Sequence, residues 1–245
     1  MKKPSVLIIP LLFIITCSYA QSNKFDHSIF DALLSANVDD SGMVNYRAFI
    51  NNQQFATYIE TIENANLSKL TNEDKLAFYI NAYNATVIKN VLDYLPINSP
   101  MDVDGFFNKI KHTIAGKEIT LDELEHKYAL KIEPVLSHFG LVCAAVSCPK
   151  LLDKAYDGKT VFSQLEENAQ LYLNDHNKNK LDRENRILYL SEVFKWFKDS
   201  FVKKYGSLTE TAIQFMSDDN RAFLMNNEAS VKFLKYNWKL NTQTD

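Results

Sequence analysis

The sequence is poor in the residues that define several protein classes. It has three cysteines, too few for a disulfide-dense miniprotein, and only six glycines and six prolines, which excludes collagen-like and proline-rich linker architectures. Its formal charge of −3 and its pI near 6.0 argue against broad electrostatic binding to nucleic acid or to anionic lipid. With 46% hydrophobic and 23% charged residues, the chain has the average composition of globular proteins, which argues against intrinsic disorder.

The first twenty residues have the pattern of a secretory signal peptide. Two lysines precede a short apolar run, residues 6–15, and the small residues Ser18 and Ala20 stand at positions −3 and −1 of a cleavage site after Ala20. The run is about half of the ~20 residues that a membrane-spanning helix needs, so no transmembrane segment is expected after cleavage. The alternative is lipoprotein processing at Cys17, for which Thr16 is an atypical preceding residue. The sequence therefore predicts export, to the periplasm or as a secreted protein.

A single domain, from about residue 25 to residue 241, is the simplest interpretation of the chain after the leader, because no internal repeat or linker is visible. Helical spacing of apolar residues predicts helices near residues 30–34, 55–62, 72–95 and 162–172. Two strand–turn–strand patterns, residues 111–119 and 178–190, predict hairpins. The expected fold class is α+β: a helix-rich single domain with a small antiparallel sheet and hairpins.

The helix predicted over residues 72–95 has the strongest pattern. Thr71 is its expected N-cap, and Pro96 ends it by disfavouring helical geometry at the preceding residue. One apolar stripe runs along it, made of Leu76, Ile80, Tyr83, Val87 and Val91. Further apolar residues widen this face, so the helix is expected to lie at the centre of the fold.

Weaker patterns complete the expected fold. The sequence from Thr120 to Glu123 is a capping box that opens a helix through about residue 130. Ser191 caps another helix, which Gly206 ends. Residues 39–42 form a turn cluster. The apolar run 135–145 is expected to be a buried strand, with a helix as the alternative, and period-two alternation over residues 234–241 predicts a half-buried strand.

The two cysteines of the predicted mature chain are candidates for chemistry. Cys143 lies inside an apolar run and is interpreted as a small core residue. Cys148 lies between Ser147 and Pro149, where a strand is expected to enter a loop, and a thiol there is a candidate nucleophile if a neighbouring group stabilises its thiolate. The alternatives are a disulfide with Cys143, which an oxidising compartment favours, or a buried thiol. Their spacing is not that of a zinc or CxxC redox motif.

Histidines and buried amides supply the other candidates. His138 precedes Cys148 by ten residues and is a candidate base, and His126 follows Glu125, which is placed to orient an imidazole. Asn81 and Asn84 lie in the apolar part of the predicted central helix, where a buried amide needs hydrogen-bond partners. They either tie down neighbouring loops or orient a catalytic group or stabilise an oxyanion.

Other motifs are absent or incomplete. The histidines form no zinc-ligand pair, and no metal or cofactor site is predicted. The segment 102–105 resembles the start of a calcium loop, but its glycine comes two residues early and Thr113 replaces the closing glutamate. The aromatic residues Trp196, Phe197, Tyr236 and Trp238 are interpreted as core residues, with a platform for a sugar or base as the alternative.

Five motifs occur in one order along the chain. They are Ala77-Phe-Tyr-Ile-Asn-Ala-Tyr-Asn-Ala85, Thr120-Leu-Asp-Glu-Leu-Glu-His126, His138-Phe-Gly-Leu-Val-Cys143 with Ser147-Cys-Pro149, Leu190-Ser-Glu-Val-Phe-Lys-Trp196 and Phe233-Leu-Lys-Tyr-Asn-Trp-Lys-Leu-Asn241. Over about residues 44–241 the chain resembles the domain-of-unknown-function 547 family, which is common in exported bacterial proteins. Family members often have Asp-Trp in the last motif, where this chain has Asn237 and Trp238.

The resemblance implies no assigned activity, and it carries over Asn81, Asn84, Glu125, His126, His138 and Cys148 as the candidate polar set. Two functions are considered. One is a cysteine-dependent hydrolase or acyl transferase, with Cys148 as nucleophile and His138 or His126 as base. The other is a non-catalytic periplasmic binding or scaffold domain, in which these residues form a buried network. A thiol-redox protein that cycles the two cysteines is a third possibility. The partner and substrate are not predicted.

Overall fold

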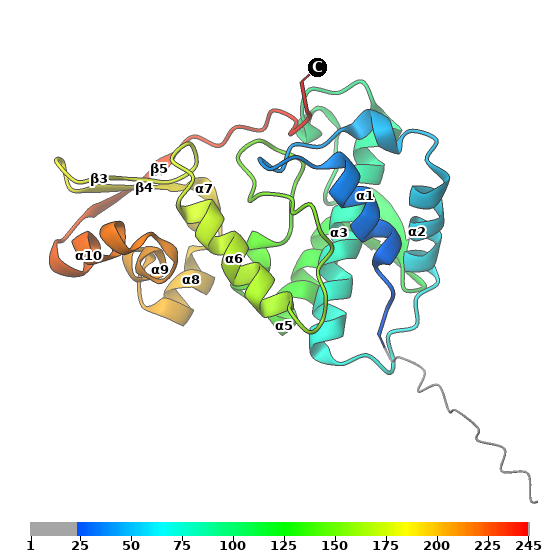
Figure 1. Ribbon diagram of the computed structural model, residues 1–245, viewed down its shortest axis with the longest axis horizontal. Coiled ribbons are helices and arrows are strands. Elements are labelled where there is room, and N and C mark those ends of the chain that lie inside the picture. The colour runs from blue at the N-terminus through cyan, green and yellow to red at the C-terminus, as the bar shows by residue number, and fades with distance from the viewer. Residues whose placement is uncertain (1–23, 245) are drawn as a thin grey trace, which may run out of the picture.

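The computed structural model describes residues 24–244 and shows the predicted α+β fold (Figure 1). The predicted signal peptide, residues 1–20, lies outside the described residues. The helices are α1 (Ser28–Asn37), α2 (Gln53–Glu63), α3 (Asn72–Tyr94), α4 (Leu121–Leu124), α5 (Leu130–Ile132), α6 (Val161–Leu173), α7 (Glu192–Trp196), α8 (Lys198–Tyr205), α9 (Leu208–Phe215) and α10 (Asp218–Asn226). Shorter helical turns are η1 (Tyr46–Phe49), η2 (Pro100–Asp102), η3 (Glu125–Ala129) and η4 (Leu136–Phe139), and the strands are β1 (Lys111–Ile114), β2 (Lys117–Thr120), β3 (Lys180–Asp182), β4 (Ile187–Ser191) and β5 (Ser230–Leu234).

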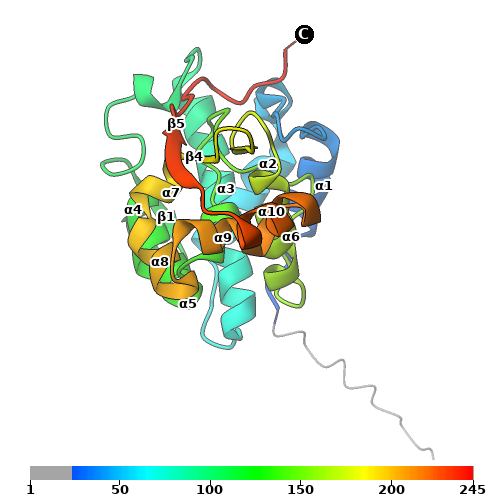
Figure 2. The same cartoon turned by 90° about the vertical axis from the view of Figure 1, so that its left-hand side faces the viewer.

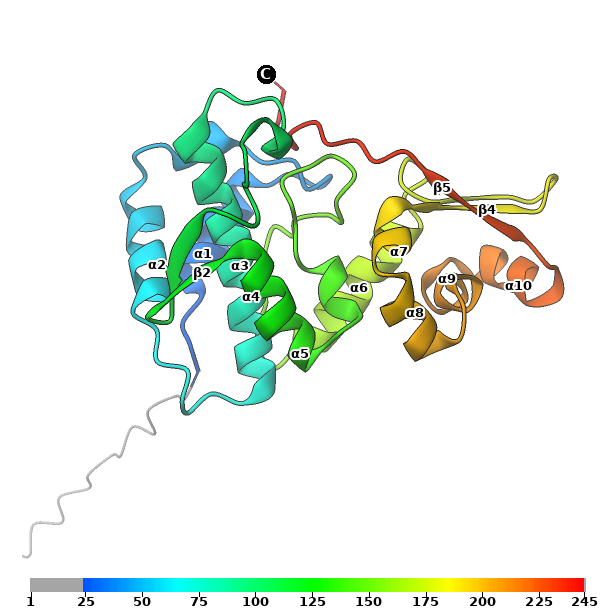
Figure 3. The same ribbon diagram turned by 180° about the vertical axis from the view of Figure 1, so that it is seen from behind.

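Helix α3 is the centre of the fold, as its sequence predicts. The Thr71 side chain accepts a hydrogen bond from the Asp74 amide, and the helix ends at Tyr94, one residue before the Leu95–Pro96 bond. Every residue of the predicted apolar stripe is buried. Helices α1 and α2 lie on one side of α3 and α6 on the other, and the buried apolar side chains form one continuous cluster (Figures 1 and 3). None of the described helices is both long enough and apolar enough to span a membrane.

The strands form two separate small sheets. Strands β1 and β2 pair as the predicted antiparallel hairpin, and β3 and β4 form the second predicted hairpin. The second sheet has the order β3-β4-β5, and β5 runs parallel to β4. The predicted antiparallel pairing is present in both hairpins, and the second sheet adds one parallel pair that the sequence does not predict. A parallel neighbour needs a long crossover connection, and here helices α7 to α10 supply it by packing beneath the sheet (Figures 1 and 2).

The apolar run 135–145 is not a strand, contrary to the prediction. Its first part is the short helix η4, and the rest is an irregular buried loop in which Ala144 has a positive φ of 57°. Side-chain amides take the place of a neighbouring strand. Asn84 bonds Gly140 and Val142, and Asn168 donates to the carbonyl of Phe139 at 2.6 Å. Buried backbone groups must form hydrogen bonds, but the pattern of apolar residues does not show whether a strand or side-chain amides provide the partners.

The alternating segment 234–241 is also not a strand. Its burial alternates as predicted over residues 234–240, but Asn241, which the alternation places on the exposed side, is buried. Strand β5 ends at Leu234, and the segment continues in an extended conformation away from the sheet. Its backbone pairs with the buried loop instead, since the amides of Val146 and Ser147 donate to Lys239 and Asn237 at 2.9 and 3.2 Å. Only one isolated bridge, Ala145 with Leu240, resembles a ladder.

The remaining predicted elements are present, with two differences. The helix expected from Ser191 to Gly206 is interrupted at Phe197, which separates α7 from α8. Gly206 ends α8 with a φ of 93°, a conformation that favours glycine. Phe162, the first residue of the apolar pattern that predicts a helix near residues 162–172, is 40% exposed at the start of α6. The turn at residues 39–42 is formed as expected, because the Asp39 carboxylate accepts from the amides at 41 and 43.

Candidate functional site

One pocket of about 210 Å³ brings together side chains from six distant parts of the described chain. Helix α3, the loop before β1, the α4–η3 segment, η4 with the buried loop after it, helix α7 with the residue that follows it, and the segment after β5 all contribute. Six of its lining residues are aromatic rings other than histidine: Tyr83, Phe107, Trp196, Phe197, Tyr236 and Trp238. The others are Asp122, Glu125, His126, His138, Leu141, Cys143, Cys148, Pro149 and Val193.

Four of the six predicted site residues line this pocket: Glu125, His126, His138 and Cys148. Their catalytic roles stay predictions. A π-helical turn, η3, begins at Glu125 directly after α4, and such turns are frequent at functional sites. Asp122, Glu125 and His126 are three and four residues apart, so they share one helix face that is directed at the pocket.

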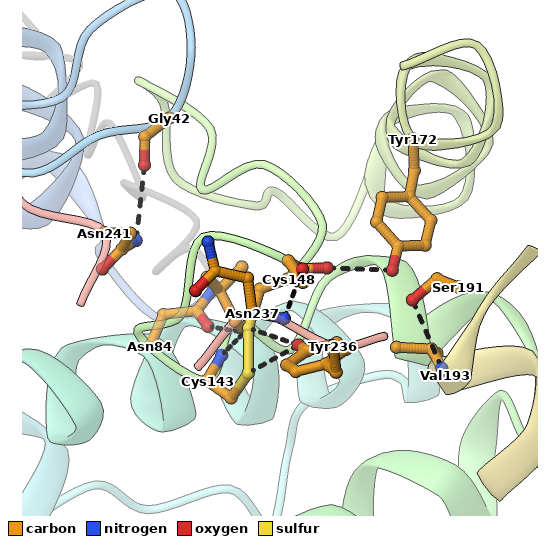
Figure 4. The surroundings of a disulfide bond; sticks show 12 residues. Gly42, Asn84, Cys143, Cys148, Tyr172, Ser191, Val193, Tyr236, Asn237 and Asn241 are labelled. Carbon is orange, nitrogen blue, oxygen red and sulfur yellow. Dashed lines mark hydrogen bonds between the residues drawn. A yellow bond between two sulfur atoms is a disulfide. The ribbon is translucent and has the colours of Figure 1, made fainter. Parts of the chain in front are cut away.

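The two cysteines are joined in a disulfide, so in this form Cys148 carries no free thiol (Figure 4). Cys148 is 2% exposed, whereas Cys143 is only partly buried. The hydroxyl of Tyr236 lies 3.1 Å from the sulfur of each cysteine. The backbone amide of Cys143 donates to the Cys148 sulfur at 3.0 Å. The disulfide is one of the alternatives that the sequence leaves open, and it forms part of the pocket wall.

Burial shifts the pKa values of Glu125 and His138, which both line the pocket. It raises the pKa of Glu125 to about 7, with a smaller opposing effect of His126. It lowers the pKa of His138 to about 3, so this imidazole is neutral at neutral pH. The His138 ring stacks on Phe197 with centroids 3.8 Å apart, and its Nε2 is buried without a hydrogen-bond partner among the described residues. A neutral imidazole with an unpaired nitrogen at a pocket is suited to bind a ligand or move a proton.

His126 is more accessible than His138. Half of its side chain is exposed, and its Nδ1 lies 3.0 Å from the backbone carbonyl of Asp122 and 3.5 Å from the Asp122 carboxylate. These contacts orient the ring at the pocket rim. Its neighbour in sequence, Glu125, is instead directed towards His138, with 3.8 Å between Oε1 and Nδ1. The sequence predicts that Glu125 orients the imidazole of His126, but the carboxylate lies close to the imidazole of His138 instead.

Asn81 and Asn84 do not line the pocket. Asn81 donates to the Tyr156 carbonyl at 2.8 Å and accepts from the Tyr156 amide at 2.9 Å. Asn84 makes the same pair of contacts with Gly140 and Val142, at 2.9 Å each. Each side chain thus replaces a backbone partner for a loop packed on α3, and the hydrogen bonds correspond to the loop-tying alternative.

Sequence reasoning misses three polar or aromatic pocket residues, Tyr83, Phe107 and Asp122. Tyr83 is predicted only as part of the apolar stripe of α3, and burial raises its pKa well above the ordinary value. The spacing of Asp122 from His126 is a usable signal. Of the aromatic residues interpreted as core, Tyr236 is buried, but Trp196 is 47% exposed and stacks on Trp238 with centroids 5.8 Å apart. The pocket therefore has an aromatic wall that is open to solvent.

The candidate site carries no obvious metal cluster. Within residues 24–244, no group of three histidine, cysteine or acidic side chains is arranged to hold a metal ion.

Residues 67–173 match the family described as "Protein of unknown function, DUF547". No curated protein and no solved structure matches the chain.

The DUF547 match supports the resemblance that the sequence motifs indicate, for this part of the chain. It spans α3, the first hairpin, the α4–η3 segment, both cysteines and α6. The motifs at 190–196 and 233–241, which supply Trp196, Tyr236 and Trp238, lie beyond the matched range. The family description gives no activity, so the function has to be argued from the pocket.

Proposed function

We propose that the protein is an extracytoplasmic binding domain whose pocket takes a small, ring-bearing molecule without negative charge. The observation that carries this proposal is the composition of the pocket: six aromatic rings and two carboxyl groups, with no lysine or arginine among its described lining residues. The leader pattern and the disulfide support the location, because disulfides persist mainly in oxidising compartments.

The size of the pocket limits the ligand. Pockets for drug-sized ligands usually measure about 300 to 1,000 Å³, and this one measures about 210 Å³. A single ring with short substituents is therefore the expected size. Offset stacking or edge contacts with Trp196, Tyr236 and Trp238, whose centroids are 4.7 to 5.8 Å apart, suit a flat or cyclic ligand.

The charge of the pocket limits the ligand further. Asp122 and the partly ionised Glu125 repel an anion, and no basic side chain in the described lining offsets them. The faces of aromatic rings attract cations, most strongly those of tryptophan. Organic cations and neutral molecules are therefore expected to bind, and cations more tightly.

Tryptophan fluorescence tests this proposal directly, because the chain has two tryptophans and both line the pocket. We would titrate benzyltrimethylammonium, benzyl alcohol and benzoate, which share a ring and differ in charge. Saturable changes are expected in the order cation, alcohol, benzoate. Tighter binding of benzoate, or no saturable change with any of the three, would contradict the proposal.

A matched pair of variants locates the binding. Trp196→Ala removes an aromatic wall and leaves Trp238 as the reporter, so the affinity for the cation should fall about tenfold or more. Phe162→Ala removes an aromatic side chain of similar exposure, 40%, that does not line the pocket. It should leave the affinity unchanged.

A cysteine-dependent hydrolase or acyl transferase is the second candidate, because Cys148, His138, His126 and Glu125 line the same pocket. It requires a reduced Cys148. Cys143→Ala prevents the disulfide and leaves Cys148 free. This variant should be acylated by p-nitrophenyl acetate faster than Cys148→Ala, which keeps only the other thiol. Equal rates for the two variants would contradict the role of Cys148 as nucleophile.

A further inference from the structure

The two sulfur atoms of the disulfide have different surroundings, so an attacking thiolate should react with one of them in preference to the other (Figure 4). Cys148 is 2% exposed, and its sulfur accepts from the backbone amide of Cys143 at 3.0 Å. No such backbone donor is directed at the Cys143 sulfur among the described residues. Cys143 is only partly buried, and both residues line the pocket.

We propose that the Cys143–Cys148 disulfide is a thiol–disulfide exchange site, at which an incoming thiolate attacks the sulfur of Cys143 and Cys148 leaves as a thiolate. This activity goes beyond ligand binding and uses the same pocket as its entrance. The incoming group is a small thiol or a cysteine of an extended peptide, and it should be neutral or cationic, because Asp122 and Glu125 lie in the lining.

The exchange proceeds in two steps that balance. In the first, the incoming thiolate forms a mixed disulfide with Cys143 as the Cys143–Cys148 bond breaks, and the electron pair of that bond stays on Cys148. In the second, another thiolate attacks the sulfur of the incoming group and releases it as a disulfide. Cys143 then leaves as a thiolate and takes a proton from water. The protein gains two electrons, and two thiols are oxidised to one disulfide; the reverse direction oxidises a dithiol.

The leaving thiolate of Cys148 would have two hydrogen-bond donors already in place. One is the Cys143 amide, and the other is the Tyr236 hydroxyl at 3.1 Å. Burial raises the pKa of Tyr236 well above its ordinary value, so this hydroxyl keeps its proton and remains a donor. Hydrogen bonds to an ionised acceptor are stronger than bonds between neutral groups. The Tyr236 hydroxyl lies equally close to the Cys143 sulfur, so it stabilises either thiolate. The Cys143 amide donates to the Cys148 sulfur alone, and it is this bond that favours departure of Cys148 over departure of Cys143 in the first step.

Cysteamine, a small cationic thiol, is the probe for the experiment. The native, full-length protein would be treated with it briefly, acid-quenched, alkylated and mapped by mass spectrometry. Cysteamine is expected on Cys143 and the alkyl group on Cys148, with at least a tenfold preference over the opposite arrangement. Thioglycolate, an anionic thiol of similar size, should react more slowly.

Two variants separate this proposal from a purely structural disulfide. Tyr236→Phe removes the hydroxyl donor and should slow reduction by cysteamine about tenfold. Tyr172→Phe is the matched control: its buried hydroxyl donates to the Ser147 carbonyl at 3.0 Å, in the same loop, but contacts neither sulfur. It should reduce at the wild-type rate, and circular dichroism would verify that both variants fold.

Three results would overturn the proposal: a mixed disulfide mainly on Cys148, equal slowing in both tyrosine variants, or a disulfide that resists cysteamine until the protein is unfolded. None of these depends on ligand binding. The ligand proposal is tested by tryptophan fluorescence on the oxidised protein, so the two can fail separately.

Discussion

Oε1 of Glu125 lies 3.8 Å from Nδ1 of His138, yet the two groups do not form an ion pair at neutral pH. Burial raises the pKa of Glu125 to about 7 and lowers the pKa of His138 to about 3, so each group is driven towards its neutral form. Near pH 5 a protonated acid faces a neutral imidazole. Near pH 8 the carboxylate is ionised beside the same neutral ring.

This pair predicts that Glu125→Gln stabilises the protein at high pH. Since the folded-state pKa of Glu125, about 7, lies above its ordinary value of 4.5, the folded state holds more protons between these values, and stability falls as pH rises through them. Glu125→Gln has no titrating carboxyl group at this position, so its stability should not fall in this way as the pH rises. Its free energy of unfolding in urea should exceed that of the wild type by up to ~3 kcal/mol at pH 8 and converge with it below pH 5. Glu60→Gln, at an exposed position, should show no such difference.

The same carboxyl group predicts how ligand affinity depends on pH. A cation binds better when Glu125 is ionised, so the affinity for benzyltrimethylammonium should rise between pH 6 and pH 8. Benzyl alcohol, which is neutral, should bind with little change over this range. In Glu125→Gln the rise should disappear. A cation affinity that stays flat with pH in the wild-type protein would contradict this role of Glu125.

His27 predicts a loss of stability in acid. Its Nδ1 lies 2.7 Å from the Tyr58 hydroxyl, and burial lowers its pKa to about 3. The unfolded state therefore binds the proton first, and the stability that His27 contributes is present above pH ~6.5 and is lost as pH falls towards 3. His27→Asn keeps an acceptor near Tyr58 but does not titrate, so its acid-unfolding midpoint should lie at lower pH. His176→Asn, at an exposed position, should match the wild type.

Substitution of Asn84 should destabilise the protein strongly without removing a side chain from the pocket. Asn84→Ala removes two buried hydrogen bonds and leaves the Gly140 carbonyl and the Val142 amide unpaired. Unfolding by urea should show a loss of about 2–4 kcal/mol. The exposed Asn226 also bonds a backbone carbonyl, but Asn226→Ala should cost less than ~1 kcal/mol. If the two substitutions had equal effects, Asn84 would not be holding the buried loop.

The parts of the fold that could be predicted from sequence are those fixed by local physics. Thr71 and Pro96 bound α3 because capping and proline sterics act over one or two residues. The β1–β2 hairpin likewise depends on the turn at residues 115–116, where both residues have positive φ.

The parts that could not be predicted depend on distant partners. The run 135–145 has the apolar pattern of a buried strand, but Asn84 and Asn168 pair its backbone from two helices. Nothing within the run encodes that choice. For the candidate site, the motifs supplied Glu125, His126, His138 and Cys148, whereas the aromatic wall required knowing that the segment after β5 turns back over the buried loop.

That returning segment has a consequence for the order in which the molecule is built. Tyr236 and Trp238 come after every named helix and strand in the chain, while the two cysteines are five residues apart and are synthesised far earlier. A nascent chain can therefore close its disulfide before the wall that covers it exists. During this interval the sulfur atoms lack the contact with the Tyr236 hydroxyl, and Trp238 is not yet in place beside Tyr236. The pocket is complete only when residues 235–241 lie along the buried loop and the Asn241 side chain donates to the Gly42 carbonyl at 3.4 Å (Figure 4).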